Sequence, residues 1–351
     1  MLVPTGSQAR VTLAVVALGT PQRLRDCLAA LSQHHSKHDF SIVCVVNAAS
    51  GDAELAHELD FPKHVLPLRL NINFGWPAGL HVARASATTE YFVWVQEDMI
   101  VLEGWLDALI DAADEHSEFV AFGSHCVDAT GASAGISAGR SVPTHDVSQW
   151  NLTDRTTVTP PAGIAEYDWV TAKGLLTRTA VWDEIGGANP ALYPLNHVDK
   201  DYCTHLRAHG YRVALVAGAK LTHLQGQSSP PMFRRFISEY RDPRFNANWG
   251  EALANLEVGA ENAEHECKPW FPGTTQRDDP LRQLEHIVAI EASTMLIAFA
   301  QWAPHFVELS LEHQRNVDAH EASATINGSF DRNERAAPPR LIRLLRSFWQ
   351  R

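Results

Sequence analysis

Residues 91–98 read YFVWVQED, so five apolar residues are followed directly by Gln96, Glu97 and Asp98. A short run of β-branched and aromatic residues is typical of a strand that is buried on both faces. Such strands occur in parallel sheets that helices cover on both sides. Because ligands of these sheets bind beyond the carboxyl ends of the strands, the three polar residues are candidate site residues.

The residues on either side of this strand alternate between strand and helix patterns. Apolar, strand-like runs occupy 11–18, 41–47 and 64–70, and stretches with helical spacing separate them. After the quoted strand, helical spacing over 104–116 precedes another strand-like run at 118–126. This alternation predicts an α/β fold with a mostly parallel sheet flanked by helices.

The second half of the chain carries a helix–strand unit that ends in a histidine. Residues 199–209 predict a helix, since they begin with an aspartate and stop before a glycine. A strand over 211–216, a turn at Gly218 and a second short strand then lead to His223. The helix advances roughly 16 Å, and the strand returns roughly 20 Å. Asp199 and His223 can therefore meet at one edge of the sheet.

Composition changes twice along the chain. A loop rich in Gly, Ser, Thr and Pro runs from about 128 to 163, and loops of that length are commonly functional. Beyond about residue 230 the patterns become helical, with an apolar helix near 281–303. We therefore expect a catalytic-type domain over 1–230 and a C-terminal helical extension over 231–351.

The bulk numbers describe an acidic protein with few cysteines. The net charge of −12 over 351 residues argues against nucleic-acid binding. The five cysteines form no CxxC pair, which indicates a reduced protein with buried thiols. The N-terminus lacks the apolar core of a signal peptide. We expect a cytoplasmic location, with a peripheral position at the inner face of the membrane as an extension of it.

Two C-terminal stretches bear on partners. The apolar stretch over 286–303 is interrupted by Glu291, which favours a buried or dimer-forming helix over a membrane span. The tail over 338–351 alternates arginines with Leu, Phe and Trp. That pattern is typical of an interfacial helix on anionic lipid, and it fits equally a helix docked on the protein. A homodimer and a peripheral membrane contact are both open.

Asp98, Asp199 and His223 together suit one kind of chemistry. A hard divalent cation on a diphosphate takes oxygen ligands, and Mn²⁺ also accepts imidazole. A second carboxylate beside it can act as a general base. Each residue alone also has a plain interpretation, as a helix cap or an ordinary histidine. The chain has neither a GxGxxG motif after the first strand nor a phosphate-binding GxxxxGK[ST] loop, so dehydrogenase and P-loop functions are disfavoured.

Three stretches, at 11–33, 71–101 and 192–229, resemble the family 2 glycosyltransferases, which have the GT-A fold. The resemblance covers roughly residues 10 to 230 and is nearest to the bacterial rhamnosyltransferase-like branch. It implies an inverting transfer of a hexosyl or deoxyhexosyl unit from a nucleotide-diphosphate donor, with Mn²⁺ or Mg²⁺ as the cofactor. The acceptor, whether a glycan, a lipid-linked sugar or a small molecule, is unknown.

The resemblance also implies roles for individual residues. Asp98 and His223 would bind the metal, and Asp199 would be the general base. Asp201 would be structural or would face the acceptor, and Trp169 would lie on the acceptor side. The donor-binding residues would be Gly19, Thr20, Asn47, Gly75, Gln96, Glu97 and Lys173. Lys173 and Arg178 lie near the strand pair on the acceptor side. Either could contact phosphate, but a solvated or ion-paired surface charge is the favoured interpretation of each.

Four positions depart from the family pattern. Asn47 and Gln96 stand where acidic residues are usual, Val198 replaces an acid before the base, and His81 lies where Asn is common. These changes point to an unusual donor or acceptor, or to a weakened enzyme. Two alternatives therefore stay open: a nucleotidyltransferase of similar fold, and a non-catalytic protein that binds a nucleotide-sugar in a decayed site.

Overall fold

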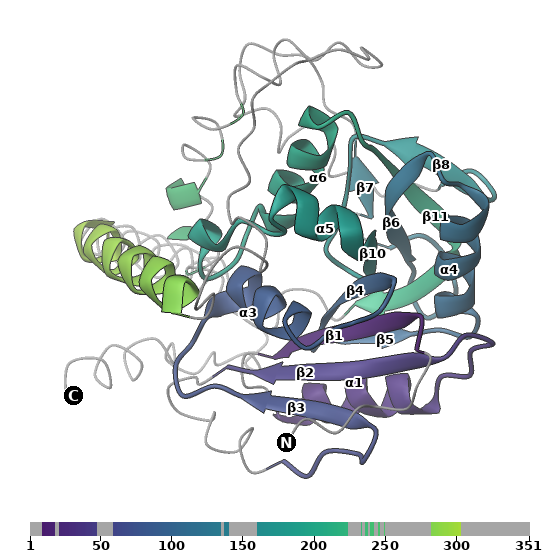
Figure 1. Cartoon of the computed structure of the whole chain (residues 1–351), viewed down its shortest axis with the longest axis horizontal. Coiled ribbons are helices and arrows are strands. Elements are labelled where there is room, and N and C mark those ends of the chain that lie inside the picture. Colours follow the sequence, from purple (N-terminus) through teal and green to yellow (C-terminus); the bar gives the residue numbers. More distant parts are fainter. Residues whose placement is uncertain are drawn as a thin grey trace, which may run out of the picture. The chain divides into compact units, whose positions relative to one another are not determined.

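The structure is a computed structural model, shown in Figure 1. The residues that it describes are 9–17, 21–47, 59–134, 137–139, 160–223, 233, 236–237, 239–241, 245, 249 and 282–302. The chain separates into two compact units, 1–297 and 298–351. The domain boundary expected near residue 230 is not tested by this division and stays a prediction.

A nine-stranded mixed sheet forms the centre of the first unit, in the order β3-β2-β1-β4-β10-β6-β11-β5, with β8 also paired to β11. Strands β1 to β4 are mutually parallel, whereas β10 runs antiparallel to both of its neighbours. The strands of this sheet are β1 (Val11–Ala17), β2 (Phe40–Val46), β3 (Val65–Arg69), β4 (Tyr91–Gln96), β5 (Met99–Val101), β6 (Phe119–Cys126), β8 (Ile164–Tyr167), β10 (Leu175–Arg178) and β11 (Arg212–His223). Strands β7 (Ala138–Gly139) and β9 (Trp169–Val170) form a separate antiparallel pair.

Helices cover both faces of the sheet, as Figure 1 shows. The helices are α1 (Pro21–Gln33), α3 (Gly75–Arg84), α4 (Trp105–Glu115), α5 (Thr179–Ile185) and α6 (Val198–Ala208), with a short 3-10 helix, η2, at Pro190–Leu192. Leu13 and Val15 of β1 pack with residues of α1 and α4, and Ala14 and Val16 pack with residues of α3, α5 and α6. Alternate side chains of one strand thus enter two cores, and the expected α/β sheet is confirmed.

The strand order places the candidate site. Strand β1 lies between β2 and β4, so the direction of winding reverses beside β1. In open α/β sheets the crevice at such a reversal is where ligands bind, at the carboxyl ends of the strands. Here those ends are Ala17 of β1 and Gln96 of β4, and Gln96 is paired in parallel register with Val16, the residue before Ala17.

The strand that carries His223 differs from the expected pair of short strands. Strand β11 is continuous from Arg212 to His223, and its pairing with β6 shifts register between Val216 and Lys220. A bulge therefore absorbs the extra residues around Gly218 without ending the strand. The prediction of a turn at Gly218 was wrong, whereas the predicted strand conformation up to His223 is confirmed.

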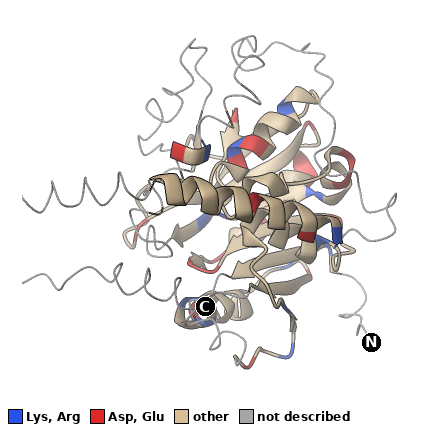
Figure 2. Cartoon of the chain, turned by 90° about the vertical axis from the view of Figure 1, so that its left-hand side faces the viewer, with Lys and Arg blue, Asp and Glu red and all other residues tan. Residues whose placement is uncertain are grey.

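A helix over Arg282–Trp302 confirms the apolar helix expected near 281–303. Leu284 and Val288 are buried against the core of α3, α5 and α6, while Ile290 and Ile297 are at least half exposed. Among the described residues it is the one helix whose length and mean hydropathy of 1.2 would allow a membrane span, and 11% of it is buried. Figure 2 shows that most of its length is uncharged.

The cysteine prediction is confirmed for the part of the chain that is described. Cys27, Cys44, Cys126 and Cys203 are free and buried. Burial raises the pKa of the Cys44 and Cys203 thiols to about 12, so these thiols stay protonated and unreactive at neutral pH. Cys267 lies outside the described residues.

Candidate active site

A tight turn after β4 brings Asp98 to His223. Strand β5 begins directly after Asp98 and pairs antiparallel with the end of β11, which sets His223 opposite Met99. The Oδ1 atom of Asp98 lies 3.2 Å from Nε2 of His223. The Oε1 atom of Gln96 lies 3.0 Å from the same nitrogen. His223 thus meets two side chains at the β4–β5 turn, Gln96 and Asp98, that lie more than 120 residues earlier in the chain.

The spacing of these side chains fits a shared divalent cation. Two ligands each about 2.1 Å from a cation and at a right angle to each other lie about 3.0 Å apart, which is close to the separation of Asp98 Oδ1 and His223 Nε2. The residues that the structure describes contain no group of three or more His, Cys, Asp or Glu that could hold a metal. A cation held by Asp98 and His223 would take its other ligands from phosphate and water, as Mg²⁺ commonly does in proteins.

Asp199 lies in the first turn of α6 and is held by two backbone amides. Its Oδ2 accepts a hydrogen bond from the Ala172 N–H at 3.1 Å, and its Oδ1 accepts one from the Lys200 N–H at 3.0 Å. The side chain is half-buried. Each carboxylate oxygen keeps a further lone pair, so Asp199 can still accept a proton.

The loop that binds Asp199 also joins it to β4. Two residues after Ala172, the Gly174 N–H donates to the Trp94 carbonyl at 3.1 Å. Strand β4 ends two residues after Trp94, at Gln96. Asp199 and Asp98 therefore lie on structures that meet at the same end of β4, which is the arrangement a base and a cation site need for a common substrate.

Asn47 is bound to the backbone at the start of α3. Its Oδ1 accepts from the Phe74 N–H at 3.0 Å, and its Nδ2 donates to the Gly75 carbonyl at 3.2 Å. The side chain is fully buried. An aspartate here would have no proton to donate to Gly75, so the departure from the family pattern at Asn47 fits the local backbone.

Gly75 opens α3 at a position where a larger residue would not fit. Its φ is +68°, and a Cβ there would lie 2.8 Å from the backbone of Pro194. The next residue, Trp76, donates its N–H to the Pro194 carbonyl at 2.7 Å. The start of α3 is therefore packed directly on the turn that precedes α6.

Asp201 and Trp169 occupy less open positions than Asp199. Asp201 is 1% exposed and accepts a hydrogen bond from Trp249 Nε1 at 2.7 Å. Burial raises its pKa to about 7, against the lowering effect of the hydrogen bonds from Trp249 and Asn189. Trp169 is buried, and the Lys200 ammonium lies 4.8 Å from the centre of its ring. Of the two roles considered for Asp201, this placement fits the structural one.

The remaining predicted donor residues divide into three groups. Glu97 is buried in the β4–β5 turn beside Asp98, and Lys173 lies in the loop between Ala172 and Gly174. Gly19 and Thr20 lie outside the described residues. Arg178 is at the far end of β10, where it donates to the carbonyls of Ala113 and Phe119. The phosphate contact considered for Arg178 was wrong, because β10 runs antiparallel to β4 and carries it to the opposite edge.

Two other departures from the family pattern have structural explanations. His81 is buried, its Nε2 lies 2.6 Å from the Ala188 carbonyl, and burial lowers its pKa to about 4. It is therefore a neutral donor that ties α3 to the segment after α5. Val198 is buried in the core of α3, α5 and α6, where an unpaired acid would be costly.

Sequence reasoning missed the C-terminal residues that contact this region. Arg241 and Trp249 are buried. Arg241 binds the Ala191 carbonyl in the segment that leads into α6, and Trp249 binds Asp201 in the first turn of α6. Buried residues recur at 237, 241, 245 and 249, four apart, which is a helical spacing that the sequence displays. The signal was present, but it does not say which surface the helix covers.

Comparison with known proteins finds one family whose model matches part of the chain. Residues 12–134, about a third of the chain, match the family described as Glycosyl transferase family 2. This stretch contains Asp98 and ends before Asp199 and His223. Together with the observed sheet, the match confirms the expected fold class and supports a glycosyltransferase. No curated protein matches the chain.

One solved structure is similar to the chain at the level of its backbone. It is the crystal structure of GalNAc-T7 with UDP, GalNAc and Mn²⁺, with 15% sequence identity and a TM-score of 0.48. The similarity covers 72% of this chain and 52% of that one, so the chain spans about half the length of the structure that it matches.

Proposed function

We propose that this protein is an inverting, divalent-cation-dependent glycosyltransferase that moves a hexosyl or deoxyhexosyl unit from a nucleotide-diphosphate donor to an acceptor hydroxyl. One observation carries the proposal: Asp98, Gln96 and His223 converge at the carboxyl end of β4, beside the loop that holds Asp199. The family match over residues 12–134 supports the class of reaction. We also propose that the protein belongs to the branch of this family that is similar to the bacterial rhamnosyltransferases.

In this mechanism Asp98 and His223 would hold the cation, which would supply positive charge to the diphosphate leaving group. Asp199 accepts the proton of the acceptor hydroxyl as that oxygen attacks the anomeric carbon, and the bond from this carbon to the diphosphate breaks to release the nucleotide diphosphate. The amides of Ala172 and Lys200 fix the orientation of the Asp199 carboxylate, so that less motion is needed to reach the transition state. Buried Asn47 sets the start of α3 on the donor side.

The two alternatives predict different outcomes in an activity assay. A nucleotidyltransferase would release pyrophosphate, and a protein with a decayed site would bind a donor without turnover. Asn47, His81 and Val198 each have a structural explanation, so the departures at these positions do not by themselves indicate decay. A functional transferase is therefore the better interpretation.

A thermal-shift screen of nucleotide-sugars, with and without Mn²⁺, tests the proposal first, because a bound ligand raises the apparent stability by mass action. The proposal expects at least one nucleotide-sugar to raise the melting temperature only when Mn²⁺ is present. Nucleotide release with that donor is measured next. Pyrophosphate release, or donor binding without any turnover against a panel of sugar and lipid-linked acceptors, would contradict it.

Partners and location complete the proposal. We place the protein in the cytoplasm, with peripheral contact at the inner face of the membrane through residues 338–351, which lie outside the described residues. Liposome co-sedimentation of the full chain and of a chain ending at residue 338 tests this. A homodimer formed through the exposed face of the helix Arg282–Trp302 is proposed on the exposure of Ile290, Leu296 and Ile297, and the molar mass in solution tests it.

A further inference from the structure

Several described residues between 236 and 249 are buried, and two of them contact the first turn of α6 and the residue before it. The ring of Phe245 stacks on His197 at 5.3 Å, and Trp249 Nε1 donates to Asp201 at 2.7 Å. His197 and Asp201 stand two residues before and two residues after Asp199. The loop of Ala172 therefore binds the Asp199 carboxylate, and C-terminal side chains contact the residues two positions before and two positions after Asp199.

Arg241 makes the third contact, with the turn that precedes α6. It is fully buried, and its Nη1 donates to the Ala191 carbonyl at 2.8 Å. Ala191 belongs to η2, and three residues later Pro194 accepts the N–H of Trp76 at 2.7 Å. The turn over 190–194 thus lies between Arg241 and the first turn of α3.

Glu291 connects Arg241 to the C-terminal helix. Its Oε2 lies 3.6 Å from Arg241 Nη1, and its side chain is 15% exposed. A buried guanidinium needs a negative partner, since an uncompensated buried charge is strongly unfavourable. The helix Arg282–Trp302 therefore contacts Arg241 through an ion pair, and its Leu284 and Val288 belong to the same core cluster as Leu192 of the turn.

From these contacts we infer that Arg241 is a positioning residue, which sets the turn over 190–194 and thereby the distance between the donor side at α3 and the base Asp199. The inference rests on the proposed function, since it needs Asp199 to act on a bound donor. Arg241 touches neither reacting group. Its effect passes through the Ala191 carbonyl to Pro194 on one side and to α6 on the other.

The test compares two substitutions on the same helix, each of which replaces a glutamate by the uncharged glutamine. Glu291→Gln removes the partner of Arg241 but keeps its shape, and Glu285→Gln changes an exposed glutamate as the matched control. Arg241→Met removes the guanidinium, and Arg241→Lys returns one donor and the charge. Each full-length variant is assayed for nucleotide release from the nucleotide-sugar with the largest Mn²⁺-dependent thermal shift. Donor affinity is measured by calorimetry, and hydrogen exchange is followed over residues 189–201.

We expect Glu291→Gln and Arg241→Met to lower kcat about tenfold, since small misplacements of a catalytic group are costly. Donor affinity should stay within about twofold of wild type, Arg241→Lys should recover most of kcat, and exchange should rise over 189–201 while Glu285→Gln behaves as wild type. Such a split between kcat and binding would not follow from a general loss of stability, in which donor affinity and kcat fall together and exchange rises throughout.

Two results would overturn the inference: unchanged kcat in both Glu291→Gln and Arg241→Met, or a general loss of stability in Glu291→Gln. If Arg241→Met does not fold, Glu291→Gln and Arg241→Lys decide. If the wild-type protein turns over no nucleotide-sugar, the proposed function fails separately, and exchange alone is decisive. A rise confined to 189–201 would then support the positioning of the turn, and unchanged exchange would exclude it.

Discussion

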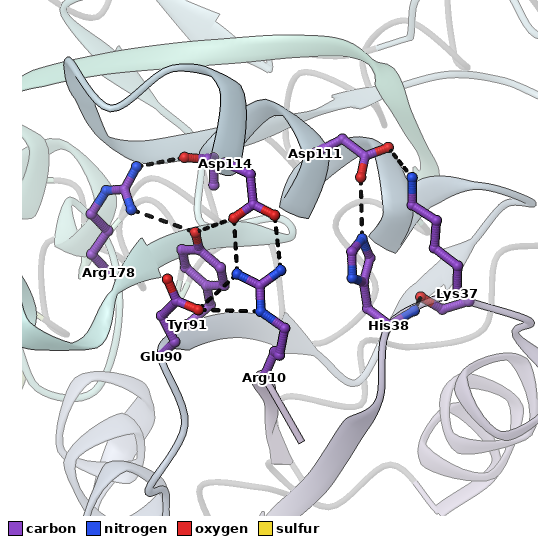
Figure 3. Close-up of polar contacts among 10 residues, drawn as sticks. Arg10, Lys37, His38, Glu90, Tyr91, Asp111, Asp114 and Arg178 are labelled. Carbon is purple, nitrogen blue, oxygen red and sulfur yellow. Dashed lines mark hydrogen bonds and ion pairs between the residues drawn. The ribbon is translucent and has the colours of Figure 1, made fainter. Parts of the chain in front are cut away.

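The two ends of strand β4 are both polar, but they are built differently. At the amino end, Arg10 donates to Glu90 at 2.7 Å and to Asp114 at 2.8 Å, and Tyr91 donates to Asp114 at 2.7 Å (Figure 3). Arg178 completes the cluster by binding backbone carbonyls. At the carboxyl end, Asp98 is 5% exposed and faces the imidazole of His223, whose buried Nδ1 has no hydrogen-bond partner among the described residues.

This difference between the two ends of β4 bears on which end would hold the proposed cation. A guanidinium is always charged and fills a carboxylate's lone pairs with parallel hydrogen bonds. Asp114 is therefore matched within the protein, and the hydrogen bond from Arg10 lowers its pKa to about 2. An imidazole is neutral over much of the physiological range and is also a metal ligand. The proposed function assigns cation binding to Asp98 beside His223, and the four predictions below test this contrast.

The largest effect is expected at Asp199. In Asp199→Asn the group that accepts the acceptor proton is lost, so transfer should fall about 10²- to 10⁴-fold. Binding of the donor should change little, because the amide keeps the size of the carboxylate and its one oxygen can still accept from either Ala172 or Lys200. Nucleotide release at saturating donor measures the first quantity and calorimetry the second. A wild-type rate in this variant would remove Asp199 from the mechanism.

The next effect separates the two ends of β4 directly. Asp98→Asn should weaken Mn²⁺-dependent donor binding by at least the roughly 10- to 100-fold that changes around a metal site cost. Arg10→Met, at the other end, should leave that affinity unchanged. Calorimetric titrations with Mn²⁺ and with EDTA check both variants. Equal losses in the two would mean that the effect is one of stability and that the contrast is false.

Asp201 is expected to make stability depend on pH. Its pKa is raised to about 7 in the folded protein, whereas it is near 3.9 in an unfolded chain. The folded state therefore holds a proton that the unfolded state releases, so the contribution is complete below about pH 4 and is lost as the pH rises to about 7. Urea unfolding from pH 4 to 8 should show this decline in the wild type. Asp201→Asn should lack it, and a parallel decline in the variant would assign the slope to other groups.

The smallest effect is expected in the amino-end cluster. Arg10→Met should lower the free energy of unfolding by about 1 kcal/mol or less, because the ion pairs are partly exposed. Since the pKa of Asp114 is lowered to about 2 in the folded protein, its contribution is present above about pH 4 and lost as the pH falls through 2. The difference between the unfolding midpoints of wild type and variant should therefore be smaller at pH 3 than at pH 6. A gap that widens in acid would refute this assignment.

Much of the fold followed from local patterns. The apolar runs around 11–18, 41–47 and 91–96 became the buried parallel strands β1, β2 and β4, because such runs can be satisfied only between two helical layers. The sequence did not predict β5, since three residues carry no periodic signal. Yet β5 fixes the register that brings His223 to Asp98.

The sequence alone determined the α/β class, the polar ends of the strands and the carboxylate at the start of α6, because each depends on residues close together in the chain. Only the tertiary structure decided that Asn47 and His81 serve the backbone, that Arg178 belongs to the far edge, and that Arg241 reaches the turn before Asp199. These outcomes depend on strand direction and on packing between distant segments. A local pattern records that a side chain will be buried, but it does not record which partner it will meet.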